Sequence, residues 1–455
     1  MMRSKALALT ASAVLFVAGL SLPRIFAQEP PPPGNTPAPE QDPHVTLELN
    51  RGQRPPMKLA IPPFRGTATL SGAGAAAARE MEETVRRDLQ NSGYFDIIGP
   101  DKIGQVRWSG DMQKDVEPFR ALGAETLLLG DIRAEGDKIV FEGRLFDIAS
   151  AQPILAKRYR GTFTTSRRIG HTFADEVIRY LIGKPGISLS SIAFTSDRSG
   201  HKEIWIMDYD GQNQRKITGH RSTSMSPAWS PNGDALAYTS FFNGPPSIYL
   251  ADMATNRKSP VVTSGSMNTT PTFSPDGGRV AFARSVDGNV EIFSSDRGGS
   301  GMRRLTHSNA IDTNPSWSPR GGEIAFTSGR GGNPHIYLMD SEGANQRRLT
   351  FDGDYNDGAA WSPEGDLIAY TSRRGGRFQI AVVNVVTLAN RVLTSGPGEN
   401  ESPTFSPDGR KIAYVSRRSG RKQIYVMDVN GSNVQQVTQE GNNDMPDWSR
   451  IPSEP

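Results

Sequence analysis

A unit of about 44 residues recurs six times through the second half of the chain. Its marker is an aromatic residue followed by serine, and one full copy spans residues 314–350, NPSWSPRGGEIAFTSGRGGNPHIYLMDSEGANQRRLT. The aromatic falls at Trp229, Phe273, Trp317, Trp361, Phe405 and Trp448, so the steps are 44, 44, 44, 44 and 43 residues. A period this regular indicates a repeat architecture.

Each unit is predicted to contain four short strands. In the copy at 314–350 these are the aromatic segment 315–318, the alternating segments 324–328 and 335–340, and a last strand that ends at Leu349-Thr350. Turns such as Pro275-Asp-Gly277 separate the first two strands, and Asp-Gly tolerates the positive φ that a tight hairpin requires. Each unit should therefore fold as an antiparallel meander.

The ends of the repeat predict how the units assemble. The repeat begins at a second strand, 192–196, and finishes on an isolated first strand, 445–449. One four-stranded meander cannot bury both of its faces, so the units must stack, and a period of 40–45 residues with four strands is typical of a propeller. We predict a mainly β fold, a six-bladed β-propeller closed by the C-terminal strand and preceded by a small α/β domain.

The segments before the repeat predict the rest of the domain organisation. Residues 1–27 read as a secretory signal peptide, with basic residues before a short apolar run, and 28–43 as a Pro-rich flexible segment. Residues 44–185 mix strands and helices and form the expected α/β domain, with the propeller at 186–450. Within that domain we expect a strand at 58–64, helices at 75–90 and 166–182, and a bulge at Gly143.

Composition and motifs argue against several classes of function. The chain has no cysteine, and its 51 basic and 48 acidic residues nearly cancel to a net charge of +3, which is far from the basic field that nucleic acid requires. It has no G-x-S-x-G, P-loop or H-E-x-x-H motif, and its six histidines are scattered. We therefore expect a protein that is not an enzyme and has no cofactor, metal site or nucleic-acid partner.

The links that lead into the first strands are the part of the repeat that points to binding. In a meander blade these links lie at the same end as the links between strands two and three, and they surround the central channel. They should bring together Asp312, Asp354, Asp357, Glu399, Glu401 and Asp444, inside a rim of Arg373, Arg374, Arg377, Arg417, Arg418 and Arg421. Crowded carboxylates raise one another's pKa unless a cation or basic partner neutralises them, so this end is predicted to receive a protein partner.

Three segments and the repeats carry a resemblance to a known family. The segments RPPMKLAIPPF (54–64), GHTFADEV (170–177) and IAFTS (192–196), together with the Pro-x-Trp-Ser-Pro-x-Gly repeats, resemble the TolB family of the Tol–Pal system over residues 44–450. The resemblance implies a periplasmic adaptor, without enzymatic activity, that maintains outer-membrane integrity and constriction at cell division. It further implies that the propeller binds the peptidoglycan-associated lipoprotein Pal and that the mature N-terminal segment binds TolA.

The resemblance also assigns residues by position. Met267 to Thr270 match a stretch that contacts Pal, although Met267 stands where histidine is common, and His44 to Leu49 match the TolA-facing strand. Together with the channel links, the predicted partner-binding residues are Met267, Asn268, Thr269, Thr270, Asn309, Asp312, Asn314, Asn356, Asp357, Glu399, Glu401, Asp444, His44, Val45 and Leu47.

Two alternatives remain open from the residues alone. An exported propeller enzyme would bind a metal through clustered histidine and acidic side chains. A carbohydrate- or peptidoglycan-binding module would expose aromatic side chains on the links into the first strands, where Tyr355 is the one aromatic residue of the set. The expected state of the protein is a monomer in the periplasm.

Overall fold

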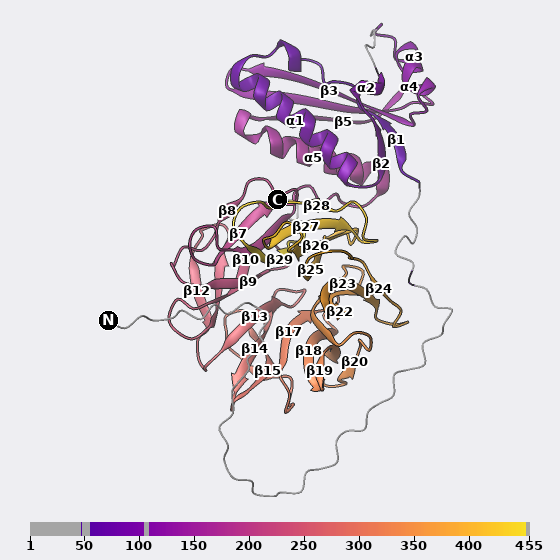
Figure 1. Cartoon of the computed structure of the whole chain (residues 1–455). Helices are drawn as coiled ribbons and strands as arrows, with labels where there is room; N and C mark the ends of the chain where they lie inside the picture. Colours follow the sequence, from indigo (N-terminus) through magenta and orange to yellow (C-terminus); the bar gives the residue numbers. More distant parts are fainter. Residues whose placement is uncertain (1–46, 48–54, 104–108, 452–455) are drawn as a thin grey trace, which may run out of the picture. The chain divides into compact units, whose positions relative to one another are not determined.

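The computed structural model describes Leu47, residues 55–103 and residues 109–451 (Figure 1). The predicted signal peptide, 1–27, and the Pro-rich segment, 28–43, lie outside the described residues. No helix in the described ranges is long and apolar enough to cross a membrane.

The first folded part is an α/β domain with one five-stranded sheet. The sheet order is β2-β1-β3-β4-β5, in which β1 pairs in parallel with β2 and β3, and the rest is antiparallel. The strands are β1 (Met57–Ala60), β2 (Phe95–Ile98), β3 (Thr126–Glu135), β4 (Lys138–Asp147) and β5 (Gln152–Thr162). The helices are η1 (Thr67–Thr69), α1 (Gly72–Asn91), α2 (Pro100–Ile103), α3 (Met112–Asp115), α4 (Glu117–Ala121), η2 (Phe163–Thr165) and α5 (Ser166–Ile182).

Helices α1 and α5 share one core with the sheet. Met81, Val85 and Leu89, at four-residue steps on α1, are fully buried and pack in one cluster with Phe141 of β4 and Phe173 of α5. Figure 1 shows the two helices together on one face of the sheet. The periodicity of α1 and the bounds predicted for α5 are both found in the structure, and Gly183 ends α5 with a φ of 77°.

The predicted bulge at Gly143 is wrong. Gly143 pairs regularly with Gly130, and the irregularity in this part of the sheet lies between Leu145 and Phe146. Glycine is required at position 143 for a packing reason, because a Cβ there would stand 2.2 Å from the ring of Phe173. The predicted strand at 58–64 is also shorter than expected and ends at Ala60.

The second part is a propeller of six four-stranded antiparallel sheets, which Figure 1 shows arranged around a common centre. We number the blades by the position of their second strands along the chain, from β6 to β26. Blade 1 is β29 (Asn443–Trp448), β6 (Ser191–Ser196), β7 (Glu203–Asp208) and β8 (Arg215–Lys216), and blade 2 is β9 (Ser224–Trp229), β10 (Ala235–Ser240), β11 (Ser247–Asp252) and β12 (Lys258–Val262). Blade 3 is β13 (Asn268–Phe273), β14 (Arg279–Val286), β15 (Asn289–Asp296) and β16 (Arg303–Arg304), and blade 4 is β17 (Asp312–Trp317), β18 (Glu323–Gly331), β19 (Asn333–Asp340) and β20 (Arg347–Arg348). Blade 5 is β21 (Tyr355–Trp361), β22 (Leu367–Arg374), β23 (Arg377–Asn384) and β24 (Asn390–Val392), and blade 6 is β25 (Asn400–Phe405), β26 (Lys411–Ser416), β27 (Gln423–Asp428) and β28 (Gln435–Gln436).

The C-terminal strand closes the ring. β29 pairs with β6 through Asn443↔Ser196 and Trp448↔Ile192, so the last strand of the chain becomes the first strand of blade 1. The first strands contact one another in an unbroken cycle, β9, β13, β17, β21, β25, β29 and back to β9. The predicted fold class, a closed six-bladed propeller preceded by a small α/β domain, is confirmed.

The first strands begin earlier than the sequence suggested. The sequence predicts that Asp312 and Asp357 lie in links before the first strands, but β17 already starts at Asp312 and β21 at Tyr355. Each first strand has a register irregularity against its partner, with a residue at positive φ such as Thr270 at 51° or Asn314 at 51°. A bulge of this kind adds a residue without ending the strand, which alternation alone does not reveal.

The α/β domain contacts blade 1 through a buried polar cluster. The Tyr209 hydroxyl donates to Asp88 over 2.7 Å, and Nδ1 of His171 lies 2.5 Å from the other oxygen of Asp88. Arg167 of α5 binds Asp210 at 2.5 Å in the turn after β7. His171 is thus a buried side chain between the α/β domain and the propeller.

Candidate partner-binding site

The end of the propeller that we call the crown consists of two sets of links. One set leads into the first strands: 219–223, 263–267, 307–311, 351–354, 395–399 and 439–442. The other set joins second and third strands, and backbone bonds tie the two sets together. For example, the Phe241 N–H donates to the Thr223 carbonyl, and the Asn268 N–H donates to the Pro246 carbonyl. The crown is therefore one ordered surface.

An acidic pair in the crown is bridged by a lysine of the chain itself. Nζ of Lys422, only 8% exposed, lies 2.7 Å from Asp444 and 3.2 Å from Glu401. Burial lowers the pKa of Lys422, but Asp444 and Glu401 outweigh burial and hold it above its usual value. The sequence led us to expect neutralisation by a cation or a partner, and for these two carboxylates Lys422 already supplies it. The role of Lys422 was missed because nothing in its local sequence separates it from a surface lysine.

Asp357 shapes the crown from within β21. Its Oδ1 accepts hydrogen bonds from Nδ2 of Asn314 and Oγ1 of Thr327, both at 2.7 Å, and from the Gly358 N–H. Tyr355 donates to the other oxygen at 3.3 Å. These bonds join blades 4 and 5 at the bulge of β21. The Asp357 carboxylate therefore accepts hydrogen bonds that stabilise the fold.

Two acids lie nearer the solvent in the same part of the crown. Asp354 is exposed and binds Arg373 at 3.0 Å, and this hydrogen-bonded pair lowers the pKa of Asp354. Glu399 is half-buried and accepts from the Phe378 N–H at 2.6 Å. We call Asp354, Asp357, Glu399, Glu401 and Asp444 the acidic arc. Asp354 is exposed and Asp357 and Glu399 are half-buried, whereas the side chains of Glu401 and Asp444 are only 14% and 13% exposed.

Three of the predicted contact residues are buried inside first strands. The side chains of Asn268, Asp312 and Asn356 are 0% exposed. Their expected role as direct partner contacts is therefore corrected, because their side chains bind other groups of the propeller: Arg284, Arg330 and His335 respectively. The expectation failed because the residues were assigned to loops.

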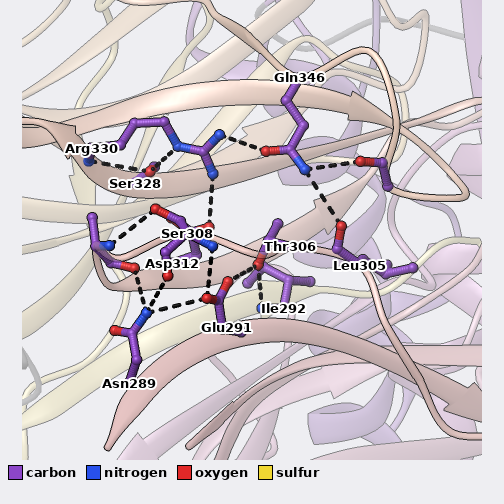
Figure 2. A network of polar contacts seen from close by, with 12 residues as sticks. Asn289, Glu291, Ile292, Leu305, Thr306, Ser308, Asp312, Ser328, Arg330 and Gln346 are labelled. Atoms are coloured by element: carbon purple, nitrogen blue, oxygen red, sulfur yellow. Dashed lines mark hydrogen bonds and ion pairs between the residues drawn. The ribbon is translucent and has the colours of Figure 1, made fainter. Parts of the chain in front are cut away.

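Asp312 belongs to the polar network shown in Figure 2. Arg330 donates to Asp312 at 2.8 Å, and Arg304 binds the equally buried Glu291 at 2.8 Å. Glu291 also accepts from Thr306 and from the Ser308 N–H. Burial raises the pKa of Asp312, and the nearby Glu291 adds to that rise. The network fixes the link 307–311, in which Asn309 remains exposed.

The stretch that matches the Pal contact is half-buried. Met267, Thr269 and Thr270 retain partial exposure, and the Met267 carbonyl accepts from the Ser285 N–H. Thr270 has a φ of 51°, which is strained for a β-branched residue, and its N–H donates to Oγ1 of Thr239 in blade 2. The stretch is held in one conformation by its neighbours.

The N-terminal segment is described at one predicted position. His44 and Val45 lie outside the described residues. Leu47 is 8% exposed and belongs to an apolar cluster with Phe405, Tyr414 and Tyr425 of blade 6. A residue predicted to face a partner is thus buried against the propeller of its own chain.

Asp447 is a further acid that the sequence did not single out. It stands in β29 at the position that Ala228, Thr272, Ser316, Ala360 and Thr404 occupy in the other blades, and its carboxylate accepts from the Trp229 N–H at 2.7 Å. Burial raises its pKa to about 7. Comparison of the six units at this position would have revealed it.

The described residues contain no group of three or more His, Cys, Asp or Glu side chains that could hold a metal ion. In the crown, the carboxylates of Glu401 and Asp444 share Lys422. What the crown offers is a rigid ring of links with charged and apolar side chains, which suits recognition of another protein.

Comparison with known families agrees with this architecture. The model of the TolB amino-terminal domain matches residues 45–154, and that of the TolB beta propeller domain matches residues 179–451. The chain belongs to the TolB family. Its resemblance to that family, first seen in the sequence, is confirmed.

Individual relatives cover shorter stretches. The Tol-Pal system protein TolB of Geobacter sulfurreducens is 38% identical over 168 residues, 37% of this chain and 39% of the relative. The protein TolB homolog of Chlorobium chlorochromatii is 36% identical over 166 residues, 36% of this chain and 37% of the relative. Each alignment thus spans well under half of the relative's length.

A solved structure covers more of the fold. The crystal structure of TolB from Acinetobacter baumannii has a TM-score of 0.75 and 27% sequence identity, and the match covers 88% of this chain and 98% of that chain. The order of α/β domain and propeller in this TolB-family chain is therefore shared with a solved TolB structure.

Proposed function

We propose that this TolB-family chain is a periplasmic adaptor of the Tol–Pal system, without enzymatic activity. In this proposal the crown binds a Pal-like peptidoglycan-associated lipoprotein, and the mature N-terminal segment binds a TolA-like inner-membrane protein. The adaptor then helps to maintain outer-membrane integrity and constriction at cell division. Family membership supports the system, and the crown supports the binding face.

The observation that supports this binding face is that the links of the crown are held in fixed positions. Its links are fixed by the first-strand bulges, by Asp357 and by the network around Glu291, so a partner would meet a preformed surface. Preorganised links lose little conformational entropy on binding. The more accessible acids Asp354 and Glu399 would then select a partner with basic side chains and speed its association.

The burial of Leu47 supports a link between the two binding events. Leu47 packs with Phe405 and Tyr425 of blade 6, whereas pairing of residues 44–49 with a TolA-like protein would require the segment to be free. We propose that partner occupancy of the propeller alters this packing and thereby changes access to the segment.

Calorimetry can test the binding face. The double variant Asp354→Asn/Glu399→Gln removes one exposed and one half-buried charge while it keeps the shape of both side chains. Titrated with the soluble domain of the Pal-like lipoprotein of the same organism, it should bind about tenfold more weakly, with a smaller dependence of Kd on salt. Glu364→Gln is the matched control, because Glu364 is exposed and lies in the turn between β21 and β22, at the opposite end of the propeller. Equal affinity of the double variant and the wild type would refute the role of the acidic arc.

The N-terminal assignment needs a separate test. Deletion of residues 44–49 should abolish binding of a TolA-like periplasmic domain and leave the affinity for the lipoprotein domain within a few-fold of wild type. Retained binding of the TolA-like domain would contradict the assignment.

A further inference from the structure

One repeat position in the crown carries an arginine in four of the six blades. These are Arg198, Arg330, Arg374 and Arg418, each two residues after a serine at the end of the second-strand core. In each, the arginine Nε donates to that serine's hydroxyl, at 3.0, 2.8, 3.4 and 3.1 Å in chain order. We call this arrangement the arginine clasp.

Blade 6 shows what the clasp does. The guanidinium of Arg418 lies over the ring of Tyr425, 4.9 Å from its centroid, and donates to the Tyr414 hydroxyl at 2.8 Å and to Asn400 of the first strand at 3.4 Å. In blades 1 and 4 the arginine likewise covers aromatic rings and reaches a first-strand side chain, Asn443 or Asp312. The clasp therefore satisfies buried polar groups and covers apolar rings.

Blade 2 replaces the clasp with phenylalanine. Its serine, Ser240, is present and accepts from the Phe242 N–H at 3.2 Å, as Ser416 accepts from the Arg418 N–H. The groups that the clasp would bind have no protein partner among the described residues: the Tyr238 hydroxyl and the Ser224 hydroxyl, which correspond to Tyr414 and Asn400. Two buried unpaired hydroxyl groups reduce stability, so the blade is less stable than its repeat allows.

Blade 3 departs from the repeat in a different way. It has Val286 at the clasp position, but Arg284, two residues earlier, donates to Asn268 at 3.2 Å and lies over the ring of Phe293. Arg284 thus replaces the missing contacts from another place. Blade 2 has no such replacement among the described residues, which sets Phe242 apart.

The side chain of Phe242 is exposed to solvent on an ordered link. Its side chain is 48% exposed and the neighbouring Phe241 is 37% exposed, both high for large apolar residues. The Phe242 ring contacts the ring of His220, with centroids 4.3 Å apart, and Asn243 anchors the link by donating to the Tyr249 hydroxyl at 2.8 Å. Rigid, exposed aromatic side chains in such a position are typical of binding hot spots.

The rim of this aromatic patch is mainly basic. The links beside it, 197–202 and 219–223, contain His201, Lys202, His220 and Arg221, while Asp197 is bound to Asn442. Backbone bonds from Ser224 to the Lys202 carbonyl and from Phe241 to the Thr223 carbonyl hold both links next to Phe242. An apolar centre with a cationic rim complements an apolar side chain flanked by carboxylates.

We infer that Phe241, Phe242 and His220 form a docking surface for a protein segment that presents an apolar side chain among acidic residues. The inference rests on the proposed function, in that the segment belongs to the lipoprotein that binds the crown. The surface continues directly into the predicted contact stretch, since the Asn268 N–H donates to the Pro246 carbonyl at the end of the same link. The crown thus has two halves: the aromatic patch binds acidic and apolar groups, and the acidic arc binds basic groups.

The repeat itself supplies the decisive variant. Phe242→Arg restores the clasp, since Ser240, Tyr238, Tyr249 and Ser224 are all in place to receive it. We expect a melting temperature equal to or above that of the wild type, and binding of the soluble lipoprotein domain at least roughly tenfold weaker, as for removal of an aromatic hot spot. Phe242→Ser should weaken binding similarly without the gain in stability. Val386→Ser, at an 82% exposed apolar residue between β23 and β24, is the matched control and should bind like the wild type.

The outcomes separate the two proposals. If the wild type binds the lipoprotein domain and Phe242→Arg and Phe242→Ser bind it equally well, the docking surface is refuted while the proposed function stands. Loss of binding in both variants with unchanged binding by Val386→Ser supports the surface. If the wild-type chain does not bind the lipoprotein domain at all, the proposed function fails and the inference fails with it.

Discussion

Blades 2 and 6 are built from the same repeat but differ at one crown position. In blade 6, Arg418 binds Ser416, Tyr414 and Asn400 and covers Tyr425. In blade 2, Phe242 takes that place, and two buried hydroxyl groups are left without a protein partner. A repeat protein can lose such an interaction in one unit because the ring supports the others. The comparison teaches that departures from a regular repeat, more than the repeat itself, indicate where function lies.

The variant with the largest expected effect tests whether the C-terminal strand completes blade 1 as the local first strand completes each of the other blades. Deletion of residues 445–449 removes most of β29, including the buried Trp448, and leaves β6 with an unpaired edge. The free energy of unfolding should fall by more than about 5 kcal/mol, measured by chemical denaturation. Unchanged stability would mean that the ring is not closed by the C-terminal strand.

The next variant tests the clasp in a blade that has it. Arg330→Met leaves the fully buried Asp312 without its guanidinium partner, and breaking a buried pair costs about 3 kcal/mol. Arg347→Met, which removes a largely exposed pair with Glu323, should change stability by less than about 1 kcal/mol. Similar losses in the two variants would contradict a structural role for the clasp.

Asp447 sharpens the comparison of blade 1 with the other five. Its pKa is raised to about 7 from an ordinary 3.8, so the folded state is destabilised as the carboxylate ionises between pH 3.8 and 7. Asp447→Asn keeps an acceptor for the Trp229 N–H and should be about 1–2 kcal/mol more stable than the wild type at pH 8, since the side chain retains partial exposure. The difference should vanish near pH 4. A stability difference between Asp447→Asn and the wild type that stays constant from pH 4 to pH 8 would refute the raised pKa of Asp447.

The smallest expected effect concerns His335, where blades 5 and 6 have Gln379 and Gln423. His335 accepts a hydrogen bond from Asn356, and burial lowers its pKa to about 4. The unfolded chain takes up a proton near pH 6.5 and the folded one near pH 4, so stability is lost as pH falls between these values. His335→Gln should match the wild type at pH 8 and exceed its stability by about 1 kcal/mol at pH 5. Parallel stability curves would count against this assignment.

The sequence predicted the architecture more completely than the site. Period, turn residues and the isolated final strand were sufficient for the propeller, because repetition and closure depend on spacing alone. The placement of Asn268, Asp312 and Asn356 failed, because a bulge extends a strand into a segment whose polar residues suggest a loop. Lys422 and the missing clasp in blade 2 depend on contacts between distant segments, and their consequences became clear only in three dimensions.

The account depends most directly on the claim that the crown receives the partner. Hydrogen–deuterium exchange of the chain, with and without the soluble lipoprotein domain, tests that claim residue range by residue range. We predict protection of the amide groups at 219–223, 241–246, 263–270 and 395–402, with no change in the turns 231–233 and 407–409 at the opposite end. Protection confined to those turns, or absent from the crown at saturating partner, would contradict the account.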